Sequence, residues 1–153
     1  MSRIVVIGSG IAGLFAALRL DEAGHDVVVI TKQRPKDSST NWAQGGIAGI
    51  LDKTDGAGKD AHISDTLEAG DGLCDESVVR LVVEEAGDRI RDLLEVGVEF
   101  EKDGDEFHLV KEGGHTARRI LHAKDATGAE IERALTEAIS KSEKISMRPH
   151  TLG

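Results

Sequence analysis

The chain has 153 residues, the usual length of one globular domain, and 39% of them are hydrophobic. Its formal net charge is −9, which argues against sequence-independent binding to nucleic acid and against a polybasic membrane anchor. No apolar run approaches the roughly 20 residues that span a bilayer, and the N-terminus lacks the layout of a signal peptide. Cys74 is the single cysteine, so no intrachain disulfide forms. We expect a cytoplasmic protein.

The first 32 residues predict a strand, a helix and a second strand. The apolar runs 4–7 and 27–30 are typical of parallel strands that are buried on both faces of a sheet. Between them, apolar side chains recur at helical spacing as far as Gly24, which we expect to end the helix. This pattern predicts the βαβ core of a Rossmann-like α/β fold.

A G-x-G-x-x-G motif joins the first strand to the helix. Gly8 permits a tight turn, Gly10 lets the backbone approach a pyrophosphate, and Gly13 lets the helix pack closely on the strand. The helix N-terminus adds free N–H groups and partial positive charge. The alternative is a glycine-rich turn without a ligand. We predict cofactor contacts at all six residues of the motif: Gly8, Ser9, Gly10, Ile11, Ala12 and Gly13.

The end of the second strand indicates which dinucleotide binds. NAD-binding domains usually carry Asp or Glu there, but this chain has Thr31 and Lys32. An NAD-dependent dehydrogenase is therefore disfavoured, although it remains one alternative, beside a non-enzymatic nucleotide-binding or partner module. Lys32 is assigned to the cofactor site as a phosphate or ribose ligand, and a solvated lysine is the alternative.

The remainder of the chain divides into two segments. Residues 33–60 are rich in glycine and predict a long functional loop. Residues 61–153 predict two helices, a hairpin-like pair (98–100 and 107–110) around Asp103-Gly104, a loop, a third helix and a strand that returns to the sheet. Gly97 should end the second helix.

Smaller signals in the last segment concern helix caps and metals. Residues 127–130 resemble a capping box that would open the third helix. His62 and Asp65 are interpreted as a solvated helix face. No pair of His or Cys has metal-ligand spacing, so we assign no metal site.

Residues 39–48, STNWAQGGIA, resemble a run found in the succinate dehydrogenase, fumarate reductase and L-aspartate oxidase flavoproteins. In that superfamily the loop lies along FAD, where glycines let main-chain N–H groups approach the flat ring. Ser39 stands where the respiratory enzymes usually carry a histidine bonded to FAD, so the resemblance implies non-covalent FAD. It assigns cofactor contacts to Ser39, Thr40, Asn41, Trp42, Ala43, Gln44, Gly45 and Gly46.

Residues 112–122, EGGHTARRILH, resemble the E-G-G-H-S-x-R-R-I-L-H signature of L-aspartate oxidases. Relatives that act on plain dicarboxylates generally carry a bulky apolar residue where Glu112 stands. The resemblance assigns Glu112 to orienting the substrate amino group, and a carboxylate suits that role because it attracts an ammonium. Ala117 departs from the family, where a larger polar or basic residue is common.

The other polar residues of this segment have two interpretations each. Arg118 and Arg119 either face flavin or substrate charge or form structural ion pairs. His115 and His122 are interpreted as hydrogen-bonded scaffolding of the motif rather than as reacting groups.

The resemblance implies that residues 1–153 are the N-terminal part of the FAD-binding domain of an L-aspartate oxidase. Such an enzyme oxidises L-aspartate to iminoaspartate, passes electrons to fumarate or oxygen, and supplies quinolinate synthase in pyridine nucleotide (NAD) biosynthesis. A fumarate reductase-like or succinate dehydrogenase-like flavoprotein is the alternative. Because family members have several hundred residues, we expect the rest of the FAD domain, a capping domain and a C-terminal helical domain to be absent. The chain alone should be inactive.

Overall fold

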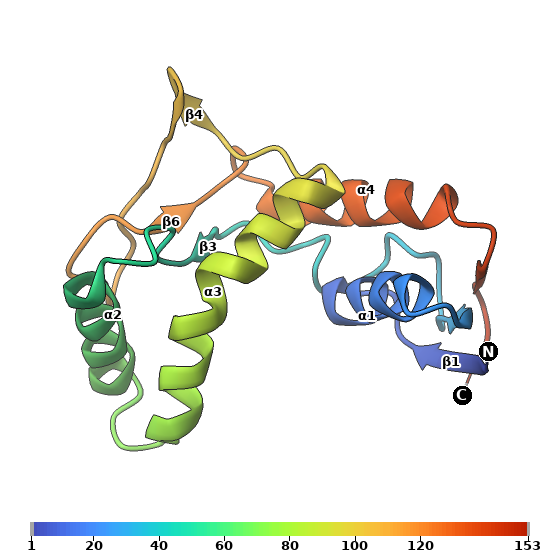
Figure 1. Cartoon of the computed structure of the whole chain (residues 1–153), viewed down its shortest axis with the longest axis horizontal. Helices are drawn as coiled ribbons and strands as arrows, with labels where there is room; N and C mark the ends of the chain where they lie inside the picture. The colour runs from blue at the N-terminus through green and yellow to red at the C-terminus, as the bar shows by residue number, and fades with distance from the viewer. Residues whose placement is uncertain (1, 153) are drawn as a thin grey trace. The chain divides into compact units, whose positions relative to one another are not determined.

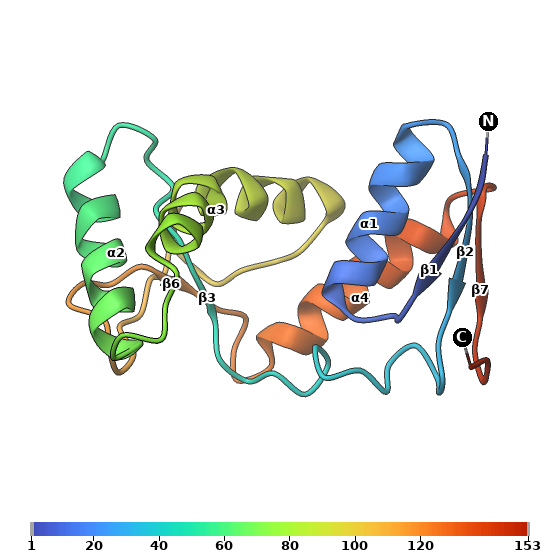
Figure 2. The same cartoon turned by 90° about the horizontal axis from the view of Figure 1, so that it is seen from below.

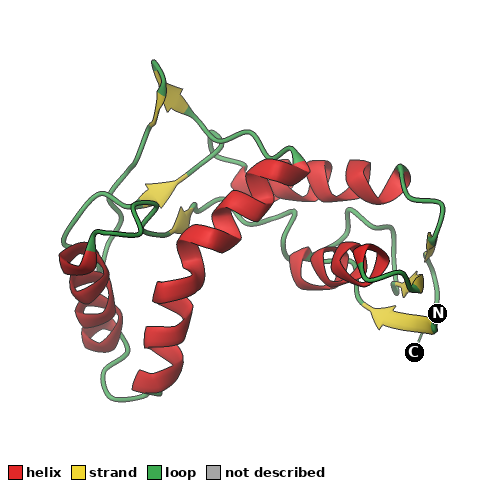
Figure 3. Ribbon diagram, in the orientation of Figure 1, coloured by secondary structure: helices red, strands yellow, loops and turns green. Residues whose placement is uncertain are grey.

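The computed structural model describes residues 2–152, which form two compact units (Figures 1 and 3). The first unit contains the described residues up to Gly45, then Val96–Glu99, then those from Ala126 onward. The second contains Gly46–Glu95 and Phe100–Asp125. A parallel sheet combined with four helices confirms the α/β fold class. The units cut across the three consecutive segments that the sequence predicted, because chain from both ends of the sequence joins in one sheet.

The first unit is built on a parallel sheet of three strands in the order β1-β2-β7. Helices α1 and α4 both lie on one side of this sheet (Figure 2). The elements are β1 (Arg3–Ile7), α1 (Ile11–Glu22), β2 (Asp26–Ile30), α4 (Thr127–Ser140) and β7 (Ile145–Arg148). The predicted strand–helix–strand unit and the returning strand are thus confirmed.

Burial differs between the two predicted strands. In the central strand β2, Val27, Val28 and Val29 are all buried. In the edge strand β1 burial alternates, and Val5 and Ile7 are 57% and 73% exposed. The expectation that residues 4–7 are buried on both faces is therefore wrong, because the described helices cover only one face of the sheet.

Two glycines end helices as predicted. Gly24 follows α1 with a φ of +86°, and its N–H donates to the Asp21 carbonyl at 2.8 Å. The next N–H, of His25, donates to the Leu20 carbonyl at 3.0 Å, which completes a Schellman motif. Gly97 has a φ of +102° directly after α3 (Glu76–Val96). Both positions require the left-handed conformation that glycine adopts most easily.

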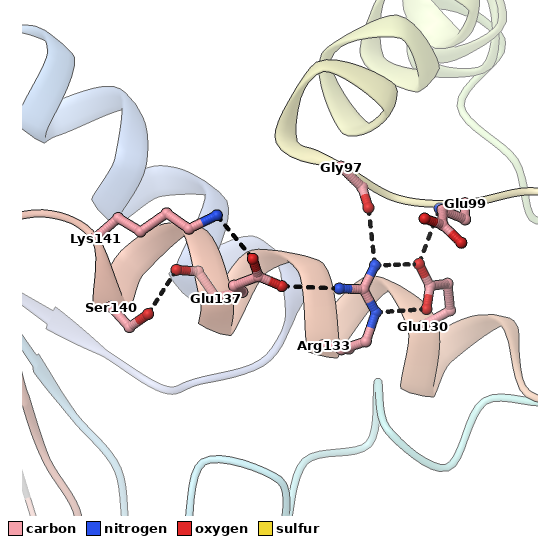
Figure 4. A network of polar contacts seen from close by, with 7 residues as sticks. All are labelled: Gly97, Glu99, Glu130, Arg133, Glu137, Ser140 and Lys141. Atoms are coloured by element: carbon pink, nitrogen blue, oxygen red, sulfur yellow. Dashed lines mark hydrogen bonds and ion pairs between the residues drawn. The ribbon is translucent and has the colours of Figure 1, made fainter.

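Arg133 on α4 holds the short segment after α3 in place (Figure 4). Its guanidinium donates to Glu130 at 2.7 and 2.8 Å, to Glu137 at 3.0 Å and to the Gly97 carbonyl at 2.9 Å. Glu130 also accepts the Glu99 N–H at 2.9 Å. The hydrogen bonds from Arg133 lower the pKa of Glu130, so this network is ionised at neutral pH.

The same network explains why the predicted capping box is wrong. The cap residue of α4 is Ala126, one position before Thr127, and the helix begins at Thr127. Glu130 turns away from a capping role because its carboxylate binds Arg133 and the Glu99 N–H.

The second unit combines two helices with two short antiparallel pairs, β3–β6 and β4–β5. Its elements are β3 (Ile47–Ala48), α2 (Gly56–Ala69), α3 (Glu76–Val96), β4 (Lys102–Asp103), β5 (Glu106–Phe107) and β6 (Ile120–Leu121). Buried apolar side chains of α3 and β6 form much of its core. No helix within residues 2–152 is long and apolar enough to cross a membrane.

Two element boundaries in the structure differ from the predicted ones. The loop predicted for residues 33–60 ends sooner, because α2 begins at Gly56. Asp55 caps this helix by accepting the Gly58 N–H at 2.8 Å, which offsets the low helix propensity of the glycines. The hairpin turn at Asp103-Gly104 is confirmed, but the paired strands are 102–103 and 106–107 rather than 98–100 and 107–110.

Candidate functional site

The glycine motif forms a tight turn between β1 and α1. Gly8 has a φ of +105°, and its N–H donates to the Ile30 carbonyl of β2 at 2.9 Å. A Cβ added to Gly13 would lie 2.0 Å from the Gly8 carbonyl oxygen, so only glycine permits this close approach of helix and turn. The tasks predicted for Gly8 and Gly13 therefore match the geometry.

A cavity of about 470 Å³ opens in front of this turn. Six residues that the sequence assigned to the cofactor line it, namely Gly8, Ser9, Gly10, Lys32, Ser39 and Thr40. The N-terminus of α1 and the cation of Lys32 give it partial positive character. A cavity with these groups fits the phosphates of a dinucleotide.

Two hydroxyl groups hold the walls of the cavity together. Ser9 Oγ is buried and lies 3.0 Å from Thr31 Oγ1, which joins the glycine turn to the end of β2. Thr40 Oγ1 accepts the Ile11 N–H at 3.0 Å, so a loop 29 residues away caps the first turn of α1. The Ser9 side chain therefore has a structural partner, and Thr40 joins the two predicted cofactor segments.

The loop that contains Thr40 rests on the start of α4. A Cβ at Gly128 would lie 1.8 Å from the Thr40 carbonyl oxygen, and the Gly128 N–H donates to the Ala43 carbonyl at 3.0 Å. Ser38 Oγ donates to Glu132 at 2.8 Å and accepts the Asn41 N–H at 3.1 Å. Residues 38–43 are therefore fixed by α4 as well as by α1.

Glu132 is a buried carboxyl behind this loop. It is 1% exposed, and burial raises its pKa, while the hydrogen bond from Ser38 opposes that rise. Its other oxygen, Oε1, is buried without a hydrogen-bond partner. A neutral carboxyl at this position costs less than a buried anion.

The rest of the predicted cofactor segments does not line the cavity. Three of them, Ile11, Ala12 and Gly13, belong to α1, and Asn41 and Ala43 belong to the loop, where Ala43, like Ala12, is exposed. The remaining predicted contacts are exposed or face elsewhere, namely Trp42, Gln44, Gly45 and Gly46. Their contact with flavin stays a prediction.

Gly46 has a structural reason to lack a side chain. A Cβ there would lie 2.3 Å from the Leu121 carbonyl oxygen and 2.4 Å from Ile120 Cγ2. The adjacent β3 pairs with β6, with Ile47 opposite Leu121. Close packing of two backbones therefore requires a glycine at this position of the second unit.

Several residues at the cavity were missed by the sequence analysis. Ile7 and Ile30 end their strands there, Thr31 follows β2, and Thr151 follows β7. The signal for them was the rule that ligands of open α/β sheets bind at the carboxyl ends of the strands. Asp37 also lines the cavity, so a carboxylate reaches it from the loop, although none stands at the end of β2.

In the second unit, the segment that contains Glu112 is anchored by a buried ion pair. Arg119 is 2% exposed and its guanidinium lies 2.6 Å from the Asp65 carboxylate. Asp65 also accepts the N–H and the hydroxyl of Thr116, at 2.7 and 2.9 Å. The Thr116 N–H, helped by Arg119, lowers the pKa of Asp65 to about 2.

This ion pair settles the interpretation of Arg119 and corrects the expectation for Asp65. Arg119 forms a structural ion pair, whereas Arg118 is exposed. The expectation that His62 and Asp65 form a solvated helix face is wrong, since both are buried. The positions of His62 and Asp65 in α2 could not reveal their burial, because their partners come from the distant segment 115–119.

The predicted substrate residue Glu112 is exposed. Its carbonyl accepts the His115 N–H at 3.3 Å, which turns the chain sharply at Gly113 and Gly114. Asp65, Glu68, Gly114 and other residues near this turn line a cavity of about 450 Å³. His115 Nδ1 lies 3.3 Å from the Arg119 guanidinium, in keeping with a scaffolding contact.

Comparison with known proteins decides the family. A model of the FAD binding domain family matches residues 3–152. The chain belongs to this family. FAD is therefore its cofactor, and the family is one of FAD-dependent oxidoreductases, as the motifs predicted.

Curated relatives confirm the resemblance to L-aspartate oxidases. The chain is 51% identical over 138 residues to the L-aspartate oxidase of Streptomyces coelicolor, covering 89% of this chain and 23% of the relative. It is 45% identical over 147 residues to the chloroplastic L-aspartate oxidase of Oryza sativa subsp. japonica, covering 95% and 22%. The chain spans about a quarter of the length of these relatives.

Solved structures show the same fold in respiratory flavoproteins. The apo form of the Mycobacterium smegmatis Sdh1 complex aligns with a TM-score of 0.86 and 30% identity, covering 98% of this chain and 28% of that chain. An E. coli quinol fumarate reductase FrdA variant aligns with a TM-score of 0.84 and 27% identity, covering 96% and 26%.

Proposed function

We propose that this chain is the N-terminal FAD-binding part of an L-aspartate oxidase. The carrying observation is the segment EGGHTARRILH, which begins with Glu112, in a chain 43–51% identical to curated L-aspartate oxidases. FAD, when bound, supplies the acceptor for the hydride that leaves the substrate Cα. Fumarate or oxygen would then reoxidise it, and quinolinate synthase would act downstream.

The first unit would hold the phosphates of FAD at the glycine turn. The partial positive charge at the N-terminus of α1 would attract the phosphates, and Lys32, which lines the cavity, would add a full positive charge. Thr40 would keep the flavin loop attached to this turn through its bond to the Ile11 N–H. These groups bind and orient, and they exchange no proton with the substrate.

FAD would be held without a covalent bond. Ser39 lines the cavity at the position where covalent relatives carry histidine. A serine hydroxyl is a poor nucleophile without an adjacent base, so it does not replace the histidine in forming a bond to the flavin.

Glu112 would orient the substrate amino group. Its exposed carboxylate attracts an ammonium, which distinguishes L-aspartate from succinate and fumarate. The buried Asp65–Arg119 pair and the two hydrogen bonds from Thr116 hold the following residues in place. Glu112 can therefore present its charge from a fixed turn.

A domain-exchange experiment tests this function. Residues 3–152 replace the matching part of the Streptomyces coelicolor L-aspartate oxidase, and iminoaspartate formation is measured with L-aspartate. We expect turnover by the exchanged enzyme and none by the 153-residue chain alone. Turnover by the chain alone, or none by a folded, FAD-loaded exchanged enzyme, would refute the proposal.

A fumarate reductase-like function is the second candidate, favoured by the structural match to FrdA. The variant Glu112→Leu, made in the exchanged enzyme, separates the two. An aspartate oxidase should lose most activity with L-aspartate and keep reduction of fumarate, since fumarate has no amino group. Equal loss with both substrates would assign Glu112 a general structural role instead.

A further inference from the structure

The hairpin of the second unit brings together three side chains that metals favour. Among the residues that the structure describes, Glu101, His108 and His122 each offer one ligand atom, and these atoms all lie within 4.8 Å of one another. Glu101 precedes β4, His108 follows β5, and His122 follows β6. We propose that they form a site for one divalent transition-metal ion, and that the natural ligand is Zn²⁺.

Backbone hydrogen bonds fix the three positions before any ion binds. The Glu101 N–H donates to the His122 carbonyl at 2.9 Å, and the His108 N–H donates to the Glu101 carbonyl at 2.9 Å. Glu101 is thus the middle member of a small ladder that joins the hairpin to the chain beyond β6. The three side chains do not depend on flexible loops for their proximity, which lowers the entropic cost of binding.

The distances suit a zinc ion. His108 Nδ1 lies 3.0 Å from His122 Nε2. Two nitrogens bound to a tetrahedral Zn²⁺ at about 2.0–2.1 Å are roughly 3.3 Å apart, so the rings need move only slightly. The ring planes are inclined at 65°, with centroids 5.1 Å apart.

The carboxylate is also prepared for this role. Glu101 Oε1 accepts the Lys124 N–H at 2.9 Å, which orients the group, and Oε2 lies 3.8 Å from His122 Nδ1. The side chain of His122 is 16% exposed and that of Glu101 is 39% exposed. The site is therefore shielded on one side and open to water on the other, where a water molecule can complete four-coordination.

Two imidazoles and one carboxylate select for zinc-like ions over Mg²⁺ or Ca²⁺, which prefer oxygen ligands. Such an ion would cross-link the β4–β5 hairpin to the end of β6. Because the paired strands have only two residues each, a metal bond adds a cross-link that so short a ladder lacks. The ion would thus act as a cross-link within the second unit, separate from flavin binding.

Calorimetric titration of the chelator-treated 153-residue chain with ZnCl₂ tests the site. We expect one Zn²⁺ per chain, a rise in Tm on addition of zinc, and at least a roughly tenfold loss of affinity in His108→Gln and Glu101→Gln. His150→Asn is the matched control, since His150 lies in the first unit and its φ of +57° suits asparagine.

Circular dichroism checks that each variant is folded. We expect Glu101→Gln to fold, because its amide retains an oxygen that accepts the Lys124 N–H. No heat of binding at tens of micromolar zinc, or equal affinity in wild type and folded His108→Gln, would overturn the proposal. An equal loss of zinc affinity in His150→Asn would also overturn the proposal, since zinc would then bind elsewhere.

Discussion

Replacement of Gly13 by alanine should destabilise the first unit. The added Cβ would lie 2.0 Å from the Gly8 carbonyl oxygen, a fixed backbone atom, and 3.5 Å from Val6 Cγ1. To restore even 3.0 Å, α1 must move about 1.0 Å from the turn, against its packing on β1 and β2. Overpacking of this kind costs about 1–3 kcal/mol, which in a chain of this length lowers Tm by roughly 2–12 °C.

Gly10→Ala is the matched control for this prediction. Its Cβ would lie 3.2 Å from Thr40 Oγ1, a side-chain atom that can yield by a few tenths of an ångström. Gly10 has a φ of −75°, which alanine adopts without strain. We expect Gly10→Ala to keep the wild-type Tm within about 2 °C, yet to weaken FAD binding, because the methyl group enters the cavity.

Thermal unfolding followed by circular dichroism, with FAD affinity from quenching of flavin fluorescence, separates the two effects. Gly13→Ala should lose both stability and FAD affinity, whereas Gly10→Ala should lose affinity alone. A Gly13→Ala variant as stable as the wild type would refute the close approach of α1 to the turn. Unchanged FAD affinity in Gly10→Ala would refute the position of the pyrophosphate.

Three further predictions follow from individual polar groups. The Thr116 N–H, with Arg119, keeps the pKa of Asp65 at about 2. The ionised Asp65 carboxylate therefore stabilises the fold fully above about pH 4, and this stabilisation is lost as the pH falls toward 2. Acid denaturation of Asp65→Asn should depend less on pH across that window. Burial raises the pKa of Glu132, so the folded state loses stability as the pH rises past the ordinary value of 4.5; Glu132→Gln should melt higher than wild type at pH 7. Thr40→Val removes the acceptor of one N–H of α1 and should lower the free energy of unfolding by about 1 kcal/mol, measured by urea denaturation.

Local patterns predicted the cofactor turn because its glycines reflect backbone geometry within a few residues, although Ile30, Thr31 and Thr40 complete the turn from farther along the chain. The glycine spacing gave the positive φ of Gly8 and the tight packing at Gly13, and Gly24 and Gly97 gave the ends of two helices. These features depend on backbone geometry that few other residues adopt. The resemblance to flavoproteins then supplied the cofactor, which the family match bears out.

Features that depend on distant partners were not predictable. The exposure of Val5 and Ile7 depends on which face the helices cover, and the burial of Asp65 depends on Arg119, 54 residues away. The strand at residues 120–121 has only two residues and gives no alternating pattern, although both are buried. A residue such as Glu130 suits a cap by sequence, but Arg133 competes for its carboxylate.

Retention of FAD by the 153-residue chain tests the central claim most directly. The purified chain is mixed with FAD, desalted, and then precipitated with acid, and flavin absorbance is read in the pellet and the supernatant. The cavity of about 470 Å³ with its glycine turn predicts close to one FAD per chain after desalting, all of it released by acid. A folded chain that retains no flavin, or flavin that stays in the acid pellet, would contradict a non-covalent FAD site in the first unit.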